Sequence, residues 1–234
     1  MGTLGAPWVW APPRLDSRDH QAYDCHYLTP GRSYGTSRPL RVTARGVFIL
    51  WPPVNRIAFL VDGFNLYHSL KQAIADGGGS LKWLDLRALC QTYVNSVFGR
   101  AATLDSVYYF PAFATFLTPT NPGAMTRHRT YVTALQSTGV QPLLGRFKWK
   151  PRWCPHCRRQ TPGHEEKESD VALAARLLEL GVTDAADTLV LVTGDTDLIP
   201  AILAARRLRP QKQVWVLFPY QRFNRNPYRV RVTP

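Results

Sequence analysis

The segment that most constrains the fold runs from Thr188 to Pro200 and reads T-L-V-L-V-T-G-D-T-D-L-I-P. Residues 188–193 are apolar or Thr without polar alternation, which is typical of a central parallel strand covered on both faces. A turn and the start of a helix follow directly. The segment therefore predicts an α/β fold in which Asp195 and Asp197 lie at the carboxyl end of a strand, where open α/β sheets bind ligands.

Asp195 and Asp197 form a pair of carboxylates separated by one residue. Two carboxylates this close repel each other unless a cation lies between them or one of them takes a proton. One of the two, or Thr196, can also cap the following helix. Capping accounts for one acidic residue and leaves the second unexplained, which favours a site.

An earlier strand ends in the same way. Residues 56–61 are mostly apolar and lead into D-G-F-N-L-Y-H-S, so Asp62 follows a buried strand and Asn65 lies at the head of a helix. Gly63 permits a tight turn between them, and both side chains can face one point above the sheet. Asp170 directly precedes the apolar face of another helix and can point toward the same edge.

The charge of the chain indicates a polyanionic partner. Its 234 residues include 29 Lys and Arg against 16 Asp and Glu, a net charge of +13, which favours a nucleic acid. From residue 146 to 159 every charged residue is basic, and aromatic residues alternate with them. This pattern is typical of a groove for single-stranded nucleic acid, although an edge strand kept soluble by Lys has the same composition. The residues expected to contact RNA are Arg146, Lys148, Trp149, Lys150 and Arg152.

Cys154 and Cys157 have the spacing of half a zinc site. His156, His164 or a neighbouring subunit would have to complete it, which leaves Zn²⁺ and a homodimer open. A redox role is less favoured because no strand–helix context surrounds the pair. Four cysteines make no disulfide framework, and the chain has neither a signal-peptide pattern nor a membrane-length apolar run. We therefore expect a cytoplasmic protein without a membrane partner.

Two further expectations concern residues near the predicted site. Glu165, Glu166 and Glu168 precede the helix that begins near Asp170, and they are expected to complement its dipole. Arg127, His128 and Arg129 are expected on or near the exposed side of a helix over residues 124–137.

The two ends of the chain differ from its middle. Residues 1–53 are rich in Pro, Arg, Gly and Ser, and no period of 3.6 or 2 persists in them. Two explanations stay open: a disordered basic extension, or a translation start near Val54. The folded domain is expected over residues 54–223, and a basic tail over residues 224–234.

Three motifs together carry a family resemblance: D-G-F-N-L-Y-H at 62–68, K-E-S-D-V-A-L-A at 167–174 and V-T-G-D-T-D-L-I-P-A at 192–201. They resemble the NYN domain in its bacterial LabA-like branch, a PIN-like family, over about residues 54–223. The resemblance implies a Rossmann-like parallel sheet flanked by helices, with an acidic cluster at its carboxyl edge. In that family another helix usually follows the position of Phe218-Pro219, where this chain is rich in Arg and Pro.

The resemblance also implies a function. It implies an endoribonuclease that hydrolyses RNA phosphodiester bonds with Mg²⁺ or Mn²⁺, and it places the metal ligands at Asp62, Asp170, Asp195 and Asp197. It implies catalytic roles for Asn65 and Thr193, which are expected to hydrogen-bond the attacking water or the scissile phosphate. The alternative is a non-catalytic RNA-binding or regulatory module with the same fold. The chain has no P-loop, which argues against ATP-driven chemistry.

Overall fold

The computed structural model describes residues 54–161 and 163–222. The predicted extension (1–53) and basic tail (224–234) lie outside this part of the chain. The strands are β1 (Asn55–Asp62), β2 (Ala102–Phe110), β3 (Ala112–Phe113), β4 (Val140–Pro142), β5 (Gly145–Trp149), β6 (Arg152–Trp153), β7 (Gln160–Thr161), β8 (His164–Lys167), β9 (Thr188–Val192) and β10 (Gln213–Leu217). The helices are α1 (Gly63–Ala75), α2 (Leu86–Tyr93), α3 (Pro122–Ser137), α4 (Ser169–Val182) and α5 (Ile199–Leu208), with short helical turns η1 (Val94–Phe98), η2 (Gly99–Ala101), η3 (Thr115–Leu117) and η4 (Thr196–Leu198). None of these described helices is long and apolar enough to cross a membrane.

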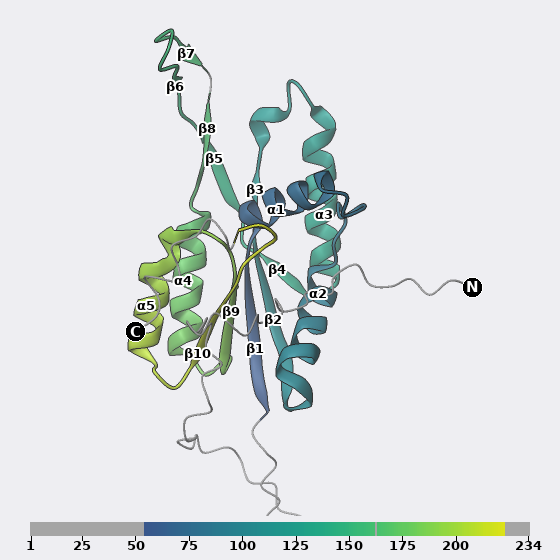
Figure 1. Cartoon of the computed structure of the whole chain (residues 1–234), viewed down its shortest axis with the longest axis vertical. Coiled ribbons are helices and arrows are strands. Elements are labelled where there is room, and N and C mark those ends of the chain that lie inside the picture. The colour runs from purple at the N-terminus through teal and green to yellow at the C-terminus, as the bar shows by residue number, and fades with distance from the viewer. Residues whose placement is uncertain (1–53, 162, 223–234) are drawn as a thin grey trace, which may run out of the picture. The chain divides into compact units, whose positions relative to one another are not determined.

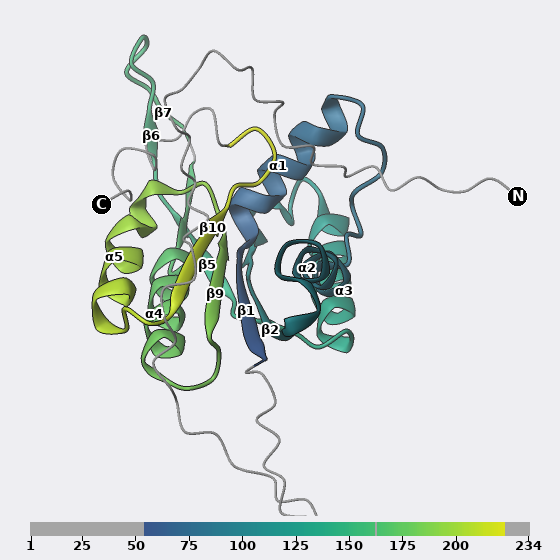
Figure 2. The ribbon, with the colours of Figure 1, turned by 60° about the horizontal axis from the view of Figure 1, so that its bottom comes forward.

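Five strands form a parallel sheet in the order β10-β9-β1-β2-β4 (Figure 1). Helices α4 and α5 lie on one side of the sheet, and α2 and α3 lie on the other (Figure 2). This arrangement confirms the predicted α/β class, a parallel sheet flanked by helices.

The position of β1 in the middle of the sheet explains why apolar and polar residues do not alternate in its sequence. Ala58 and Leu60 pack with side chains of α4 and α5, whereas Ile57, Phe59 and Val61 pack with side chains of α2 and α3. All five are at most 2% exposed, so successive residues of β1 are buried on opposite faces. Burying a large apolar side chain stabilises a fold by about 1.5–3 kcal/mol, and β1 does this on both faces.

Parallel pairing brings the ends of β1 and β9 to one edge of the sheet. Val61 is paired with Val192, so Asp62 and Thr193 follow side by side. At Gly63 a Cβ atom would lie 2.6 Å from the carbonyl oxygen of Phe110. A glycine is therefore needed for α1 to begin directly against the end of β2.

Strands β5, β6, β7 and β8 form an antiparallel hairpin that we call the arm. Strand β5 pairs with β8, and β6 pairs with β7, while β3 joins the base of the arm by pairing with β5. The arm extends from the end of the main sheet at which α1 begins (Figure 1). The sequence predicted a strand followed by a loop here, and the structure shows strands on both sides of the turn.

Candidate acidic site at the carboxyl edge of the sheet

Asp62 is the buried member of the acidic site, with 4% of its surface exposed. Its Oδ1 accepts a hydrogen bond from the backbone N–H of Asn65 (3.0 Å). Its Oδ2 accepts from Nδ2 of Asn65 (2.8 Å) and from the hydroxyl of Thr193 (2.8 Å). Burial raises the pKa of Asp62, the hydrogen bonds counteract the rise, and the charge of Asp195 adds to it. These bonds fix the orientation of Asp62 at the end of β1.

Asn65 and Thr193 connect Asp62 to the turn after β9. Oδ1 of Asn65 accepts a hydrogen bond from the backbone N–H of Gly194 (3.3 Å), and Oγ1 of Thr193 accepts from the N–H of Asp195 (3.0 Å). Thr193 is fully buried, and its hydroxyl is engaged by Asp62 and Asp195. The catalytic roles expected for Thr193 and Asn65 stay predictions.

Both sequence interpretations of the aspartate pair have a counterpart in the structure. Oδ1 of Asp195 accepts a hydrogen bond from the backbone N–H of Asp197 (2.9 Å) and thereby caps the turn η4. Asp197 is exposed. Capping thus accounts for Asp195, and the second carboxylate remains at the open edge.

Asp170 lies in the first turn of α4, close enough to the other three aspartates to interact with their charges. Loss of solvation raises its pKa, and the charges of Asp195, Asp62 and Asp197 raise it further, to about 6. Within the described residues no ion pair involves Asp170 or Asp197. The fold therefore brings carboxylates from three separate segments to one edge, where neighbouring charges disfavour the ionised forms of Asp62 and Asp170.

The fit of this edge to a metal ion depends on how the ion is held. Among residues 54–161 and 163–222, no three His, Cys, Asp or Glu side chains are grouped closely enough to hold an ion by themselves. Mg²⁺ keeps several of its waters and is usually bound by one or two carboxylates together with a substrate phosphate. The oxygen donors of Asp62, Asp170, Asp195 and Asp197 fit a hydrated Mg²⁺ or Mn²⁺ of that kind, and they do not form a closed cage.

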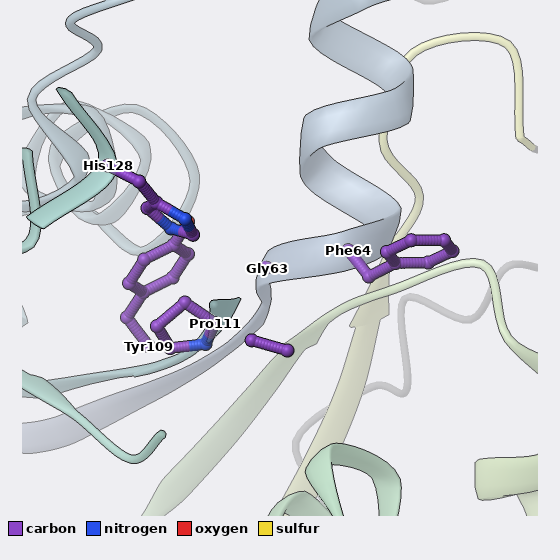
Figure 3. A pocket seen from close by; sticks show the side chains of 6 residues that line it. Gly63, Phe64, Tyr109, Pro111 and His128 are labelled. Atoms are coloured by element: carbon purple, nitrogen blue, oxygen red, sulfur yellow. The ribbon is translucent and has the colours of Figure 1, made fainter. Parts of the chain in front are cut away.

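A small cavity of about 30 Å³ lies beside the start of α1. Tyr109, Pro111 and His128 lie together on one side of Gly63, and Phe64 points to the other (Figure 3). His128 is half-buried, which lowers its pKa, and its ring meets Phe113 edge to face at 4.9 Å. His128 therefore lies near the exposed side of α3, between the exposed Arg127 and Arg129, with part of its ring covered. A water needs about 10–15 Å³, so the cavity can hold water and is too small for a nucleobase.

The arm carries more balanced charge than its basic strand suggests. Arg146 forms an ion pair with Glu168 (2.6 Å), and Glu165 pairs with both Lys150 (2.7 Å) and Lys167 (3.2 Å). Hydrogen bonds from those two lysines lower the pKa of Glu165.

The structure also corrects the expected place of two of the three glutamates. Glu165 and Glu166 lie in β8, and Glu168 precedes α4 with a left-handed φ of 77°. The helix-dipole interpretation is therefore wrong for Glu165 and Glu166, whereas Glu168 lies at the N-cap position of α4 and the interpretation stays a prediction for it.

Aromatic rings are the more accessible feature of the arm. Trp149 is 60% exposed and Trp153 is 66% exposed. Phe116 stacks on His164 with ring centroids 4.0 Å apart and also meets Phe147 at 5.2 Å. Lys148 is exposed, and Arg152 begins β6 with a side chain outside the described part of the structure.

The fold and the edge together define the class of this protein: an α/β domain with a parallel sheet and an acidic carboxyl edge. The family model of the NYN domain matches residues 56–228, and the chain therefore belongs to the NYN domain family, whose members are PIN-like domains of nuclease type. The assignment to the LabA-like branch stays a prediction.

This chain is similar to one solved structure described below. The crystal structure of a protein of unknown function, VPA0982 from Vibrio parahaemolyticus RIMD 2210633, is similar to this chain. The two are 19% identical, the match covers 73% of this chain and 85% of the other, and the TM-score is 0.46. No curated protein matches the chain.

Proposed function

We propose that the protein is a metal-dependent ribonuclease that hydrolyses phosphodiester bonds of single-stranded RNA. The observation that carries the proposal is that Asp170 lies within reach of the charges of Asp195, Asp62 and Asp197, which add to the effect of burial and raise its pKa to about 6. Four carboxylates at an open edge repel one another and would also repel an RNA phosphate. A divalent cation relieves both repulsions, and this is the support for a metal at this edge.

Asp62, Asp195 and Asp197 would hold the principal ion, with at least one of them acting through a bound water. A bound Mg²⁺ or Mn²⁺ supplies a water of lowered pKa and neutralises charge on the phosphate oxygens. Asn65 and Thr193 keep Asp62 and the turn after β9 in place through the hydrogen bonds described above. The hydroxyl of Thr193 thereby fixes the spacing between Asp62 and Asp195.

Asp170 would orient the attacking water and accept its proton. A general base works best when its pKa lies near the working pH, and a pKa of about 6 brings Asp170 closer to neutrality than an ordinary carboxylate. A second ion at Asp170 would be an alternative use of the same carboxylate.

The arm would bind the RNA strand. Exposed Trp149 and Trp153 offer faces on which bases stack, and each stacked base contributes about 1–3 kcal/mol to binding. Arg146, Lys148 and Lys150 would contact phosphates, and Arg152 is a candidate from the sequence. Because Glu165 and Glu168 already pair with two of these residues, the rings carry more of the proposed affinity than the net charge of the chain suggests.

The test is cleavage of end-labelled single-stranded RNA with Mg²⁺ or Mn²⁺, compared with EDTA and with Asp195→Asn. Asparagine keeps an oxygen that can cap η4, so the variant removes charge with little change of structure. Asp105→Asn is the matched control, because Asp105 is exposed and lies in the first half of β2, away from the carboxyl edge.

We expect metal-dependent cleavage by the wild type and by Asp105→Asn, and none by Asp195→Asn. Cleavage that survives both EDTA and Asp195→Asn would contradict the proposal. RNA binding without cleavage across varied RNAs would favour the non-catalytic module instead.

A further inference from the structure

The tip of the arm is a tightly fixed turn that the proposed ribonuclease does not use. Trp153 pairs with Gln160 across the end of the hairpin. The backbone N–H of Cys154 donates to the carbonyl of Arg159 (3.0 Å), and the N–H of Arg158 donates to the carbonyl of Cys154 (2.9 Å). Arg158 has a φ of 52°, the left-handed geometry that reverses the chain. The segment C-P-H-C is therefore held as a compact knuckle.

The knuckle carries two cysteines on one tight turn. The backbone hydrogen bonds that join Cys154 to Arg158 and Arg159 fix this turn and therefore hold the two thiols at a constant spacing. Cys154 is half-exposed and Cys157 is exposed, so both sulfurs are accessible from outside. Two preorganised thiols at this spacing form one half of a tetrahedral zinc site.

The described part of the chain does not supply the other half. Within residues 54–161 and 163–222, no third His, Cys, Asp or Glu is grouped with Cys154 and Cys157. Cys90 is 3% exposed in the core between α2 and the sheet. His164 lies flat against Phe116 in the lower part of the arm. Zinc in a structural site requires four ligands, so two must come from elsewhere.

We propose that the knuckle binds Zn²⁺ together with the same knuckle of a second copy of this chain, through Cys154 and Cys157 of each. The arm extends away from the main sheet (Figure 1), so two tips can approach each other without contact between the two sheets. A two-fold arrangement would give four thiolates around one ion, which is the closed ligand set of a structural zinc site. Each thiol releases its proton to solvent as it binds.

The charge around the knuckle favours the metal-bound pair over a metal-free one. Arg158 and Arg159 are exposed next to the cysteines, so two tips without metal repel each other. Four thiolates around one Zn²⁺ carry a net negative charge that offsets these arginines. Zinc is thus both the link between two tips and the source of the charge that allows them to meet.

The test uses the full chain, purified under a non-thiol reductant and stripped of metal. We expect addition of Zn²⁺ to give about one ion per two chains and to double the mass measured by light scattering. Co²⁺ should give the absorption bands of tetrahedral cobalt with thiolate ligands. Cys154→Ser and Cys157→Ser should each lose the bound metal and the dimer. Without metal their melting temperatures should equal that of the wild type, because the knuckle lies outside the core.

Two controls separate this proposal from a site completed within one chain. Cys25→Ser and His156→Ala should keep both the metal and the dimer. Loss of metal in either control, one ion per monomeric chain, or no binding of Zn²⁺ at micromolar concentration would each overturn the proposal. A dimer that persists without metal, or that forms only without reductant, would do so as well. These measurements need no RNA, so their outcome is independent of the proposed ribonuclease.

Discussion

Charged side chains attract one another at the amino end of the five-stranded sheet and repel one another at its carboxyl end. At the amino end Arg56 forms hydrogen bonds with both carboxylate oxygens of Asp187 (3.1 and 3.0 Å) and pairs with Asp184 (3.1 Å). Nζ of Lys212 donates to the carbonyl of Leu180 in the last turn of α4 (2.9 Å) and to that of Ala186 between α4 and β9 (2.7 Å). The hydrogen bond to Asp187 raises the pKa of Arg56 above its ordinary range. Charge at this end stabilises the fold.

The carboxyl end holds four aspartates, and burial together with the charges of neighbouring aspartates raises the pKa of Asp62 and of Asp170. A fold gains nothing from such repulsion, whereas a site that must bind a cation does. Unfavourable charge repulsion is therefore concentrated at the end of the sheet where a ligand is expected. At the amino end the charged groups form ion pairs that stabilise the fold. Substitutions of the same kind at the two ends should therefore have opposite consequences.

The largest effect is expected for Asp170→Asn. RNA cleavage should fall about 10²–10⁴-fold, as it does when a general base is removed. The melting temperature of the metal-free protein should rise, because one of four mutually repelling charges is gone. Cleavage rates at saturating RNA and thermal unfolding measure the two effects. A variant that loses both activity and stability would show that Asp170 has a structural role instead.

The stabilisation by Asp170→Asn should depend on pH. The folded-state pKa of Asp170 is about 6, against an ordinary value of 3.8, so the wild type is relatively stable below about pH 4 and loses that stability as the pH rises through about 6. The gap in melting temperature between variant and wild type should be widest near neutral pH and close as the pH falls. Thermal scans of both proteins in EDTA test this, and a gap that does not change with pH would contradict it.

Two threonines, one at each end of β9, allow a smaller but more specific comparison of the two ends of the sheet. The hydroxyl of Thr193 donates to Asp62 (2.8 Å) at the carboxyl end, and that of Thr188 donates to Asn55 (2.9 Å) at the amino end. Both are buried, and valine keeps the shape of each. Both variants should lose about 1 kcal/mol of unfolding free energy. Thr193→Val alone should lower cleavage, by about 10–100-fold. Equal cleavage by the two variants would remove the positioning role of Thr193.

Asp187→Asn is the amino-end counterpart of Asp170→Asn. The change weakens the pairing with Arg56 and should lower the free energy of unfolding by about 1 kcal/mol, with cleavage unchanged. Chemical denaturation together with the RNA assay would measure it. An increase in stability would mean that the amino end is also repulsive, and the contrast between the two ends would fail.

The smallest effect concerns the arm. Glu165→Gln frees Lys150 and Lys167 from their ion pairs, so RNA should bind more tightly and with a steeper dependence on salt. The slope of log K against log salt should change by about 0.7 for each lysine that then contacts a phosphate. Glu179→Gln is the control, since Glu179 is also exposed and paired, with Arg176 on α4. Equal slopes for the two variants would place the RNA elsewhere.

The parts of the molecule that the sequence predicts are those whose pattern is local. Residues 188–200 predict a buried strand, a turn and a helix within thirteen positions. The sequence D-G-F-N at the end of β1 likewise predicts a turn and the start of a helix. The convergence of Asp62 with Asp195 then follows from parallel strands alone.

The parts that the sequence does not predict depend on partners distant in the chain. Glu165 faces Lys148 in the register of a hairpin and pairs with Lys150, and no periodicity in the sequence specifies that register. Arg56 and Asp187 meet only once β1 and β9 are neighbours. The burial of His128 depends on the position of Phe113 after β2. In each case tertiary pairing, not residue type, decides the role.

The base of the arm has a mechanical consequence. Glu168 alone separates the end of β8 from Ser169 at the start of α4, and at Gly145 in β5 an added Cβ would lie 2.1 Å from the hydroxyl oxygen of Ser169. Both long strands of the arm thus lie against the helical turn that carries Asp170. A displacement of the arm would therefore reach Asp170 through the backbone of Glu168 and Ser169.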